Sequence, residues 1–340
     1  MTNTLAEYAA SAIRRFNFVS IANIVTLAGL IFLYPLIYCY GVWYLLAVII
    51  ATDVLRFFAR GAWYRAPLHA TSHHHNPCKD INAYLYCIIR VFSFSTLVAL
   101  SIFYRNNAWA KQTIATIWYA LTFFSVIETF RCILHTMHKH NPDWLSGAKG
   151  HIGLPNWISI IRLPLSIITP HIYIANTYGE YSNAIATSII IAAICTDALD
   201  GLIARATKSI TKAGKYLDPL GDKLIFFPNA VALMLLVDRD WMLILTIICF
   251  AIATIRDILF IIWFFLKGRK IPKGIGASMV DKVRMGGICV WLLSTAIAVS
   301  TSASASIFFT ILSAIAIGGV ALLSIASVFI DYARVKRQLS

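Results

Sequence analysis

Charged residues are scarce in this sequence: they make up 13% of its 340 residues, against about 25% in ordinary soluble domains. The scarcity argues against a soluble globular domain, and 59% of the residues are hydrophobic. Apolar runs of about 18 or more residues recur along the chain, and each is long enough to cross a hydrocarbon core about 30 Å thick. Because lipid offers backbone amides no other partner, such runs cross membranes as helices. The sequence therefore predicts an all-α polytopic membrane protein.

Cysteine pairs at metal-binding or redox spacing are also missing. None of the seven cysteines belongs to a CxxC pair, which argues against a zinc ribbon, a thiol redox motif and a secreted disulfide framework. Most of them lie inside apolar runs, where a cysteine packs as a small hydrophobic side chain.

The apolar runs divide the chain into two parts at the polar, Pro- and Gly-containing stretch 138–156. We expect about ten transmembrane helices, with boundaries uncertain by about 2–4 residues. The first four cover roughly 18–38, 41–58, 83–104 and 112–133 and form an accessory membrane region, residues 1–145. The last six cover roughly 157–175, 183–206, 219–237, 241–266, 285–303 and 307–331 and form a helical bundle within residues 150–340. Small residues in the last span, Gly318 and Gly319 among them, predict close helix packing or, as the alternative, a homodimer face.

Positive charge stands at alternate helix ends, although the net charge of +14 could suggest a nucleic-acid partner. Lys and Arg gather at Arg56–Lys79, Lys139–Lys149, Arg205–Lys215, Lys267–Arg284 and Arg334–Arg337. The opposite connections carry little positive charge, apart from Arg105 and Lys111. Cytoplasmic loops of membrane proteins show this bias. We therefore expect both termini and the site described next to face the cytoplasm of a bacterial-type inner membrane or its equivalent, and we expect no nucleic-acid partner.

Four aspartates stand where two neighbouring spans meet a short loop. Asp197 and Asp200 are three residues apart, and Asp218 and Asp222 are four apart, so each pair shares one face of a helix. If the two faces pack together, four carboxylates converge, and unpaired anions there would be desolvated and would repel each other. Mg²⁺ and Mn²⁺ prefer carboxylate oxygens, and two such ions about 3.5–4 Å apart serve phosphoryl chemistry in many enzymes. The sequence thus predicts two bound Mg²⁺ or Mn²⁺ ions.

The residues between the aspartates suit a nucleotide. Gly201 and Ala204 keep their helix face free of large side chains, and Arg205 can pair with a phosphate. Gly214 is expected to permit the turn into the next helix.

Together these residues form the pattern Asp-x2-Asp-Gly-x2-Ala-Arg-x8-Gly-x3-Asp-x3-Asp. The pattern resembles the signature of the CDP-alcohol phosphotransferase (CDP-alcohol phosphatidyltransferase) family at all eight fixed positions, and the resemblance covers about residues 155–335. It implies a six-helix domain in which the four aspartates hold the metal ions, and in which Asp222 is also the general base that takes the proton from the incoming hydroxyl. The resemblance further places the cytidine nucleotide over Asp200, Gly201, Ala204, Arg205 and Gly214.

Two further stretches resemble the phosphatidylglycerophosphate synthase and cardiolipin synthase branch of the family. One is the Pro-Asn pair ending at Asn156, with Arg162 six residues later; the other is Arg256 followed by Lys282 and Arg284. Arg256 lies about 16 Å along a helix from the positively charged end of its span, as Asp197 does in its own span. Arg162, Arg256, Lys282 and Arg284 are therefore expected to bind a phosphate on the acceptor. Alternatives are a local pair of Arg256 with its acidic neighbour, and a plain helix-flanking role for Lys282 and Arg284.

The resemblance implies an enzyme of phospholipid biosynthesis that transfers a phosphatidyl group from CDP-diacylglycerol to an alcohol and releases CMP. Glycerol 3-phosphate is the favoured acceptor. Phosphatidylglycerol, as in a cardiolipin synthase, is the first alternative, followed by inositol phosphate, serine and choline. An ion-coupled transporter is the alternative of a different class, but the sequence shows no convincing repeat between its two halves.

Histidines are concentrated in the accessory region, which holds seven of the nine. The clusters 69–75 and 135–140 loosely resemble those of membrane di-iron hydroxylases. Because the HRxxH-type box is missing and the ligand set is incomplete, a polar loop beside a four-helix bundle is the favoured interpretation.

Overall fold

The computed structural model describes residues 43–65, 81–103, 107–148, 151–237, 240–266, 279–301 and 303–339. Over these ranges the chain forms only helices and short connections. The α-helices are α3 (Trp43–Arg65), α4 (Ile81–Phe103), α5 (Ala108–His140), α6 (Leu154–Ala175), α7 (Ser182–Ala206), α8 (Lys212–Leu236), α9 (Asp240–Leu266), α10 (Met279–Ser300) and α11 (Ala303–Leu339). Two short 3₁₀ helices accompany them, η2 (Pro142–Ala148) and η3 (Gly179–Tyr181). Nine of the ten predicted spans thus correspond to helices, and the predicted span 18–38 lies outside the described residues.

Six helical segments in the described ranges are long and apolar enough to cross a membrane. They are Trp109–His140, Leu154–Ala175, Gly179–Ala206, Lys212–Leu236, Val283–Ser300 and Ser306–Ile330. A shorter apolar segment, Leu85–Leu100, lies in α4. The predicted class, an all-α polytopic membrane protein, is confirmed.

The chain divides into two compact units. The first unit comprises Met1–His171 and Cys195–Leu224, and the second comprises Ile172–Ile194 and Ile225–Ser340. The boundaries fall inside α6, α7 and α8. As a result, the segments of α6, α7 and α8 that carry Arg162 and the four aspartates belong to the same unit as α3, α4 and α5.

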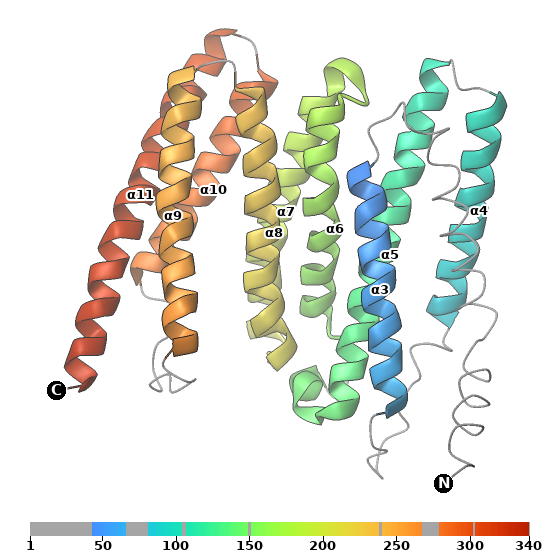
Figure 1. Ribbon diagram of the computed structural model, residues 1–340, viewed down its shortest axis with the longest axis horizontal. Helices are drawn as coiled ribbons and strands as arrows, with labels where there is room; N and C mark the ends of the chain where they lie inside the picture. Colours follow the sequence, from blue (N-terminus) through green and yellow to red (C-terminus); the bar gives the residue numbers. More distant parts are fainter. Residues whose placement is uncertain are drawn as a thin grey trace. The chain divides into compact units, whose positions relative to one another are not determined.

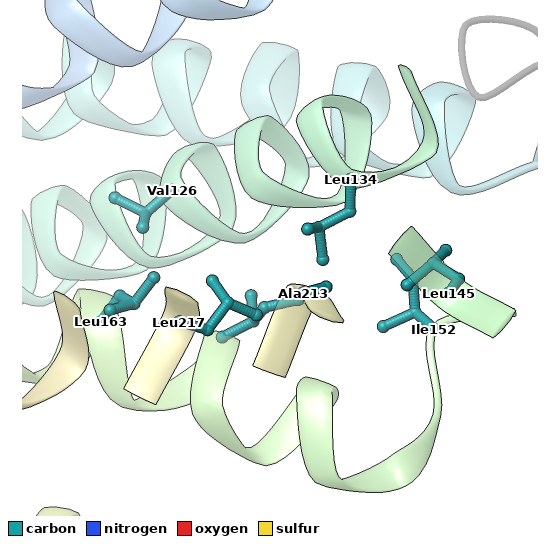
Figure 2. Packing of buried hydrophobic residues seen from close by; sticks show 8 residues of the cluster. Val126, Leu134, Leu145, Ile152, Leu163, Ala213 and Leu217 are labelled. Carbon is teal, nitrogen blue, oxygen red and sulfur yellow. The ribbon is translucent and has the colours of Figure 1, made fainter. Parts of the chain in front are cut away.

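The core of the first unit joins α5 to α6 and α8. Figure 2 shows Val126 and Leu134 of α5 facing Leu163 of α6 and Ala213 and Leu217 of α8. Leu145 of η2 and Ile152 close one end of the cluster, and Ile160 of α6 completes it. All eight side chains are buried, so α6, which carries Arg162, and α8, which carries Asp218 and Asp222, pack on α5 through a continuous apolar layer.

The 3₁₀ helix η2 is attached to the beginning of α8 by two contacts. The rings of Trp144 and Tyr216 lie 5.2 Å apart between centroids, and Lys212 Nζ donates a hydrogen bond of 2.7 Å to Asp143 Oδ2. Both members of the ion pair are more than half exposed, and exposed pairs of this kind contribute about 0–1 kcal/mol. Tyr216 is 68% exposed, so the ring contact also lies at the surface.

The turn from α7 to α8 is built without glycine. Ser209 N–H donates to the Ala204 carbonyl at 3.1 Å and Lys208 N–H to the Arg205 carbonyl at 3.4 Å, which is the hydrogen-bond pattern of a Schellman motif. Lys208 takes the left-handed position, with φ of 52°. Thr211 then caps α8, because its hydroxyl accepts a hydrogen bond of 3.0 Å from Gly214 N–H. The expectation that Gly214 permits the turn is therefore wrong: Gly214 already lies in the first turn of α8.

Charged side chains are buried among the helices α3, α4 and α5. Arg56 of α3 and Arg90 of α4 are 3% and 1% exposed, and Glu128 and Arg131 of α5 are 5% and 3% exposed. Arg56 was expected among the charges of a loop end. That expectation is wrong, because the apolar run of the span continues past Arg56 and its guanidinium is paired inside the helices.

The second unit contains the remaining parts of α6, α7 and α8 with α9, α10 and α11, the last three of which run side by side (Figure 1). Among its aromatic contacts, the ring of Phe226 of α8 lies against the rings of Phe250 of α9 and Trp291 of α10. Among the described glycines of this unit, Gly287 of α10 is the one most closely approached by a neighbouring helix: a Cβ there would lie 2.9 Å from Val320 Cγ2 of α11. A Cβ at Gly318 or Gly319 would meet nothing within 4 Å, so the close packing predicted there occurs at Gly287 instead.

Candidate active site

A single guanidinium lies among the aspartates predicted from the sequence. Arg162 of α6 forms ion pairs with Asp197 through Nη1 and with Asp200 Oδ2 through Nη2, the latter at 3.3 Å. Asp222 Oδ1 of α8 lies 3.9 Å from Arg162 Nη1. Residues of three helices thus meet at one side chain, which is completely buried.

Ser159 connects the fourth aspartate to this group. Its hydroxyl donates a hydrogen bond of 2.8 Å to Asp200 Oδ2 and lies 3.4 Å from Asp218 Oδ1. Ser159 precedes Arg162 by three residues on α6, so both side chains project from one helix face. The two side chains together contact all four aspartates.

The four aspartates differ in the exposed fraction of their side chains. The side chain of Asp200 is 7% exposed, whereas that of Asp197 is 46% exposed and that of Asp222 is 26% exposed. Asp218 is also exposed. The site therefore has a closed end formed by Arg162 and Asp200 and an open side along which the other three carboxylates are accessible.

Gly221 forms the wall of the closed end. A Cβ at this position would lie 2.9 Å from Arg162 Nη2 and 3.0 Å from Nε. These two nitrogen atoms are buried and have no hydrogen-bond partner among the described residues. The backbone of α8 can thus approach the guanidinium closely only because residue 221 has no side chain.

Among the described residues, no three or more His, Cys, Asp or Glu side chains are arranged as a metal site. The contacts given above supply the reason, because the aspartates are directed at Arg162 and Ser159. Among the described residues, the four carboxylates nevertheless outnumber the guanidinium of Arg162, which contacts three of them. In a helix bundle that crosses a membrane, this surplus of negative charge calls for a further cation, so the donor set fits a hard divalent metal ion.

The residues predicted to bind the nucleotide lie on α7 and at the beginning of α8. The guanidinium of Arg205 extends over Gly201, where a Cβ would be 3.7 Å from Nη1. Ala204 is partly buried on the same helix. Gly214 lies apart from this pair, against Asn156: a Cβ there would be 3.1 Å from Asn156 Oδ1, which accepts a hydrogen bond of 3.0 Å from Thr211. The absence of a side chain at Gly214 thus makes room for Asn156.

The predicted acceptor residues are divided between the two units. Arg162 lies in the aspartate site, where its guanidinium contacts carboxylates. Arg256 of the second unit donates from Nε to Ser327 Oγ at 2.9 Å, and Arg284 is 8% exposed. The side chain of Lys282 lies outside the described residues. An acceptor-binding role for Arg256, Lys282 and Arg284 stays a prediction.

Of the two histidine clusters, the structure describes only the one at 135–140. His140 Nε2 lies 3.2 Å from the Ala62 carbonyl oxygen, a contact between α5 and α3. No arrangement of ligands around His135, His138 and His140 is present in the described part of the chain. The cluster 69–75 lies outside that part.

Sequence reasoning missed Ser159 and Gly221. A signal for Ser159 was available, because Asn156, Ser159 and Arg162 recur every three residues along one face of α6. Gly221 is adjacent to Asp222, but only the approach of a second helix reveals what its missing side chain allows.

Comparison with known proteins gives one family and several relatives. The model of a family described as CDP-alcohol phosphatidyltransferase matches residues 152–326, just over half of the chain. No solved structure gives a significant match.

The relatives are similar over a shorter stretch. A Pseudomonas fluorescens protein named CDP-diacylglycerol–glycerol-3-phosphate 3-phosphatidyltransferase is 39% identical over 98 residues, covering 28% of this chain and 47% of that protein. A protein of the same name from Rickettsia bellii is 37% identical over 90 residues, covering 26% and 46%. A probable phosphatidylglycerophosphate synthase of Mycobacterium tuberculosis is 29% identical over 101 residues, covering 28% and 47%. The chain thus spans about half the length of the curated relatives it matches.

Proposed function

This chain belongs to the CDP-alcohol phosphatidyltransferase family, and we propose that it transfers a phosphatidyl group from CDP-diacylglycerol to glycerol 3-phosphate and releases CMP. The observation that carries the proposal is the meeting of four aspartates from α7 and α8 at Arg162 and Ser159 of α6. The names of the relatives favour this donor and this acceptor.

Asp197, Asp200, Asp218 and Asp222 would hold two Mg²⁺ or Mn²⁺ ions. When bound, the metal would neutralise charge on the pyrophosphate of the donor and on the oxygen that leaves with CMP. The exposed carboxylates of Asp197 and Asp218 lie on the open side of the site, where a metal ion and a pyrophosphate can approach together. Arg162 and Ser159 hold Asp200 from the closed side and thus fix the position of its carboxylate.

Asp222 is the residue we assign as general base. Its carboxylate is partly exposed and lies 3.9 Å from Arg162 Nη1, so an acceptor hydroxyl can reach it from the open side. In the reaction the hydroxyl oxygen bonds to the phosphorus that bears diacylglycerol, and Asp222 takes the hydroxyl proton. The bond from that phosphorus to the bridging oxygen breaks, and CMP leaves with this oxygen.

The nucleotide would lie along α7 at Asp200, Gly201, Ala204 and Arg205. The position of the Arg205 guanidinium over Gly201 supports this assignment, because an arginine fork suits a phosphate of the nucleotide. Gly214 contributes indirectly, since it makes room for Asn156. For the acceptor phosphate, Arg256, Lys282 and Arg284 are the proposed ligands.

The remaining parts of the proposal concern organisation. Residues 150–340 would form the catalytic domain and residues 1–145 an accessory membrane region. The active site and both termini would face the cytoplasm, as the distribution of Lys and Arg favours. We also propose a homodimer as the assembly.

The test is an assay of purified full-length protein with CDP-diacylglycerol, Mg²⁺ or Mn²⁺, and one acceptor at a time. CMP release and a lipid product with glycerol 3-phosphate are expected. A product only with phosphatidylglycerol would instead indicate a cardiolipin synthase, and products with inositol phosphate, serine or choline would indicate the other acceptors. If no acceptor supports CMP release while reconstituted vesicles take up an ion-coupled solute, the enzyme proposal is wrong.

A further inference from the structure

The helices α3 and α4 carry a charged cluster that the proposed reaction does not use. Asp53 lies between two arginines: it pairs with Arg56 of its own helix and, at 2.8 Å and 3.0 Å, with both Nη atoms of Arg90. Both guanidiniums also contact Tyr86, whose ring centroid lies 4.6 Å from Arg56 Cζ and 5.9 Å from Arg90 Cζ. We call Asp53, Arg56, Tyr86 and Arg90 the α3–α4 cluster.

The α3–α4 cluster holds more positive than negative charge. Among the described residues, Asp53 is the one carboxylate that pairs with its two guanidiniums. The nearby acid of α5, Glu128, accepts two hydrogen bonds of 2.8 Å from Arg131 and is engaged there. The ring of Tyr86 offsets part of the surplus by a cation–π contact, but it carries no charge. A surplus charge among apolar helices is costly unless a counter-ion neutralises it.

Two donors of the α3–α4 cluster are unsatisfied. Arg56 Nη1 and Arg90 Nε are buried and have no hydrogen-bond partner among the described residues, and the side chains that bear them are 4% and 1% exposed. Leaving a buried charged donor unpaired costs free energy. Both guanidiniums pair with the same carboxylate and lie against the same ring, so the two unsatisfied donors belong to neighbouring groups.

We propose that the α3–α4 cluster binds the phosphate group of a ligand through the guanidiniums of Arg56 and Arg90. The carboxylate of Asp53 competes with the phosphate for these guanidiniums. Arginine forks are suited to phosphate oxygens, and one bound anion would both neutralise the surplus charge and satisfy the two donors. Access is by way of Asp53, whose side chain at 11% exposed is the most accessible of the three charged groups.

The surroundings of the α3–α4 cluster fit a phospholipid as the source of this phosphate. Phe57, next to Arg56, is 69% exposed, and Phe92, two residues after Arg90, is 73% exposed. Large apolar side chains beside an arginine pair suit acyl chains with a phosphate head group. Free phosphate offers the same oxygen atoms without the chains, so the experiment must separate the two sources.

The test is a thermal-unfolding titration of full-length protein in neutral detergent, with a chelator present so that no metal ion holds phosphate at the aspartates. One series adds inorganic phosphate at constant ionic strength. A second adds mixed micelles containing phosphatidic acid, and a third adds micelles with diacylglycerol of the same acyl chains. A lipid site predicts that phosphatidic acid raises Tm and diacylglycerol does not; a rise with inorganic phosphate alone identifies free phosphate as the ligand.

Two variants that change the charge of the α3–α4 cluster in opposite directions distinguish a binding site from a structural ion-pair network. Arg90→Gln should weaken the ligand by about tenfold, as expected for a lost charged hydrogen bond. Asp53→Asn should strengthen it, because the internal competitor is gone. Lys212→Gln and Asp143→Asn make the same changes in net charge at an exposed pair and should leave binding unchanged.

The proposal fails if no phosphate-bearing ligand raises the Tm of the wild type, or if Asp53→Asn weakens binding as Arg90→Gln does. If Arg90→Gln does not fold, the comparison of Asp53→Asn with Asp143→Asn decides by itself. None of these readouts requires turnover, so they are independent of the proposed transferase activity.

Discussion

Gly221 and Arg162 are in contact across two helices, and the contact requires that residue 221 have no side chain. The guanidinium of Arg162 is completely buried, and an added Cβ would lie 2.9 Å from its Nη2. Since the same guanidinium holds Asp197 and Asp200 and lies 3.9 Å from Asp222, one methyl group on α8 would disturb three carboxylates at once.

Gly221→Ala is therefore expected to lower the rate of CMP release by at least about tenfold, and overpacking of this kind costs about 1–3 kcal/mol of stability. Arg162 has a flexible side chain, but burial and its ion pairs leave it little room to move. The matched control is Gly286→Ala, at a helical position where a Cβ would meet nothing within 4 Å. Equal activity in the two variants would show that the contact does not matter.

Ser159→Ala removes the hydroxyl that donates to Asp200. A lost hydrogen bond to a charged group costs about 1.5–3 kcal/mol, so activity should fall by roughly tenfold or more. Ser146→Ala, which removes an exposed hydroxyl from η2, should change nothing. The assay is the steady-state rate of CMP release over a range of metal concentrations, and an unchanged metal dependence in Ser159→Ala would contradict a role in placing Asp200.

Asp222→Asn should lower turnover by about 10²–10⁴-fold, the usual contribution of a general base, and Asp218→Asn should do the same through loss of a metal ligand. Asp143→Asn alters an exposed surface pair and should leave the rate at the wild-type level. Rates are compared at saturating donor and acceptor. Near-normal turnover in both site variants would refute the mechanism.

Arg162→Gln leaves four carboxylates without their guanidinium. Repulsion among them should lower Tm in the presence of a chelator, and a divalent ion should then restore more stability than it gives the wild type, since ligands that bind only the folded state stabilise it. The measurement is the difference in Tm between Mg²⁺ and chelator for each protein. A difference no larger than that of the wild type would mean that the metal does not bind at these aspartates.

Leu217→Ala tests the core that joins α5 to α8. Leu217 is 4% exposed, and truncation of a buried leucine costs about 2–5 kcal/mol. Leu220, three residues further along α8, is 40% exposed, so Leu220→Ala should cost far less. Comparable losses of Tm in the two variants would show that the buried layer between α5 and α8 contributes little.

The helices and the set of aspartates could be predicted from the sequence because both depend on local patterns. Apolar runs reveal spans, and the spacing of Asp197 to Asp222 reveals shared helix faces. The beginning of α8 could not be placed by hydropathy: the predicted span starts at 219, whereas the helix starts at Lys212. Its first turns are polar, and the cap at Thr211 is the local signal that marks the true start.

Contacts between helices could not be predicted from the sequence. Arg162 was expected to bind an anion, the phosphate of the acceptor, because of a resemblance to one branch of the family. The structure supplies that anion as carboxylates from α7 and α8, a choice that depends on how α6 packs. Arg56 was assigned to a loop end from the distribution of positive charge. Its partner Asp53 lies on the same helix, but Asp53 also pairs with Arg90 of α4, a contact that only the packing of α3 on α4 reveals.

The apolar layer shared by α5, α6 and α8 limits where this chain can be cut. A fragment restricted to residues 152–326 would leave Leu163 and Leu217 facing detergent or lipid in place of Val126 and Leu134. Chimaeras between relatives should accordingly exchange α5 and η2 together with the aspartate-bearing helices, with the junction placed upstream of Ala108.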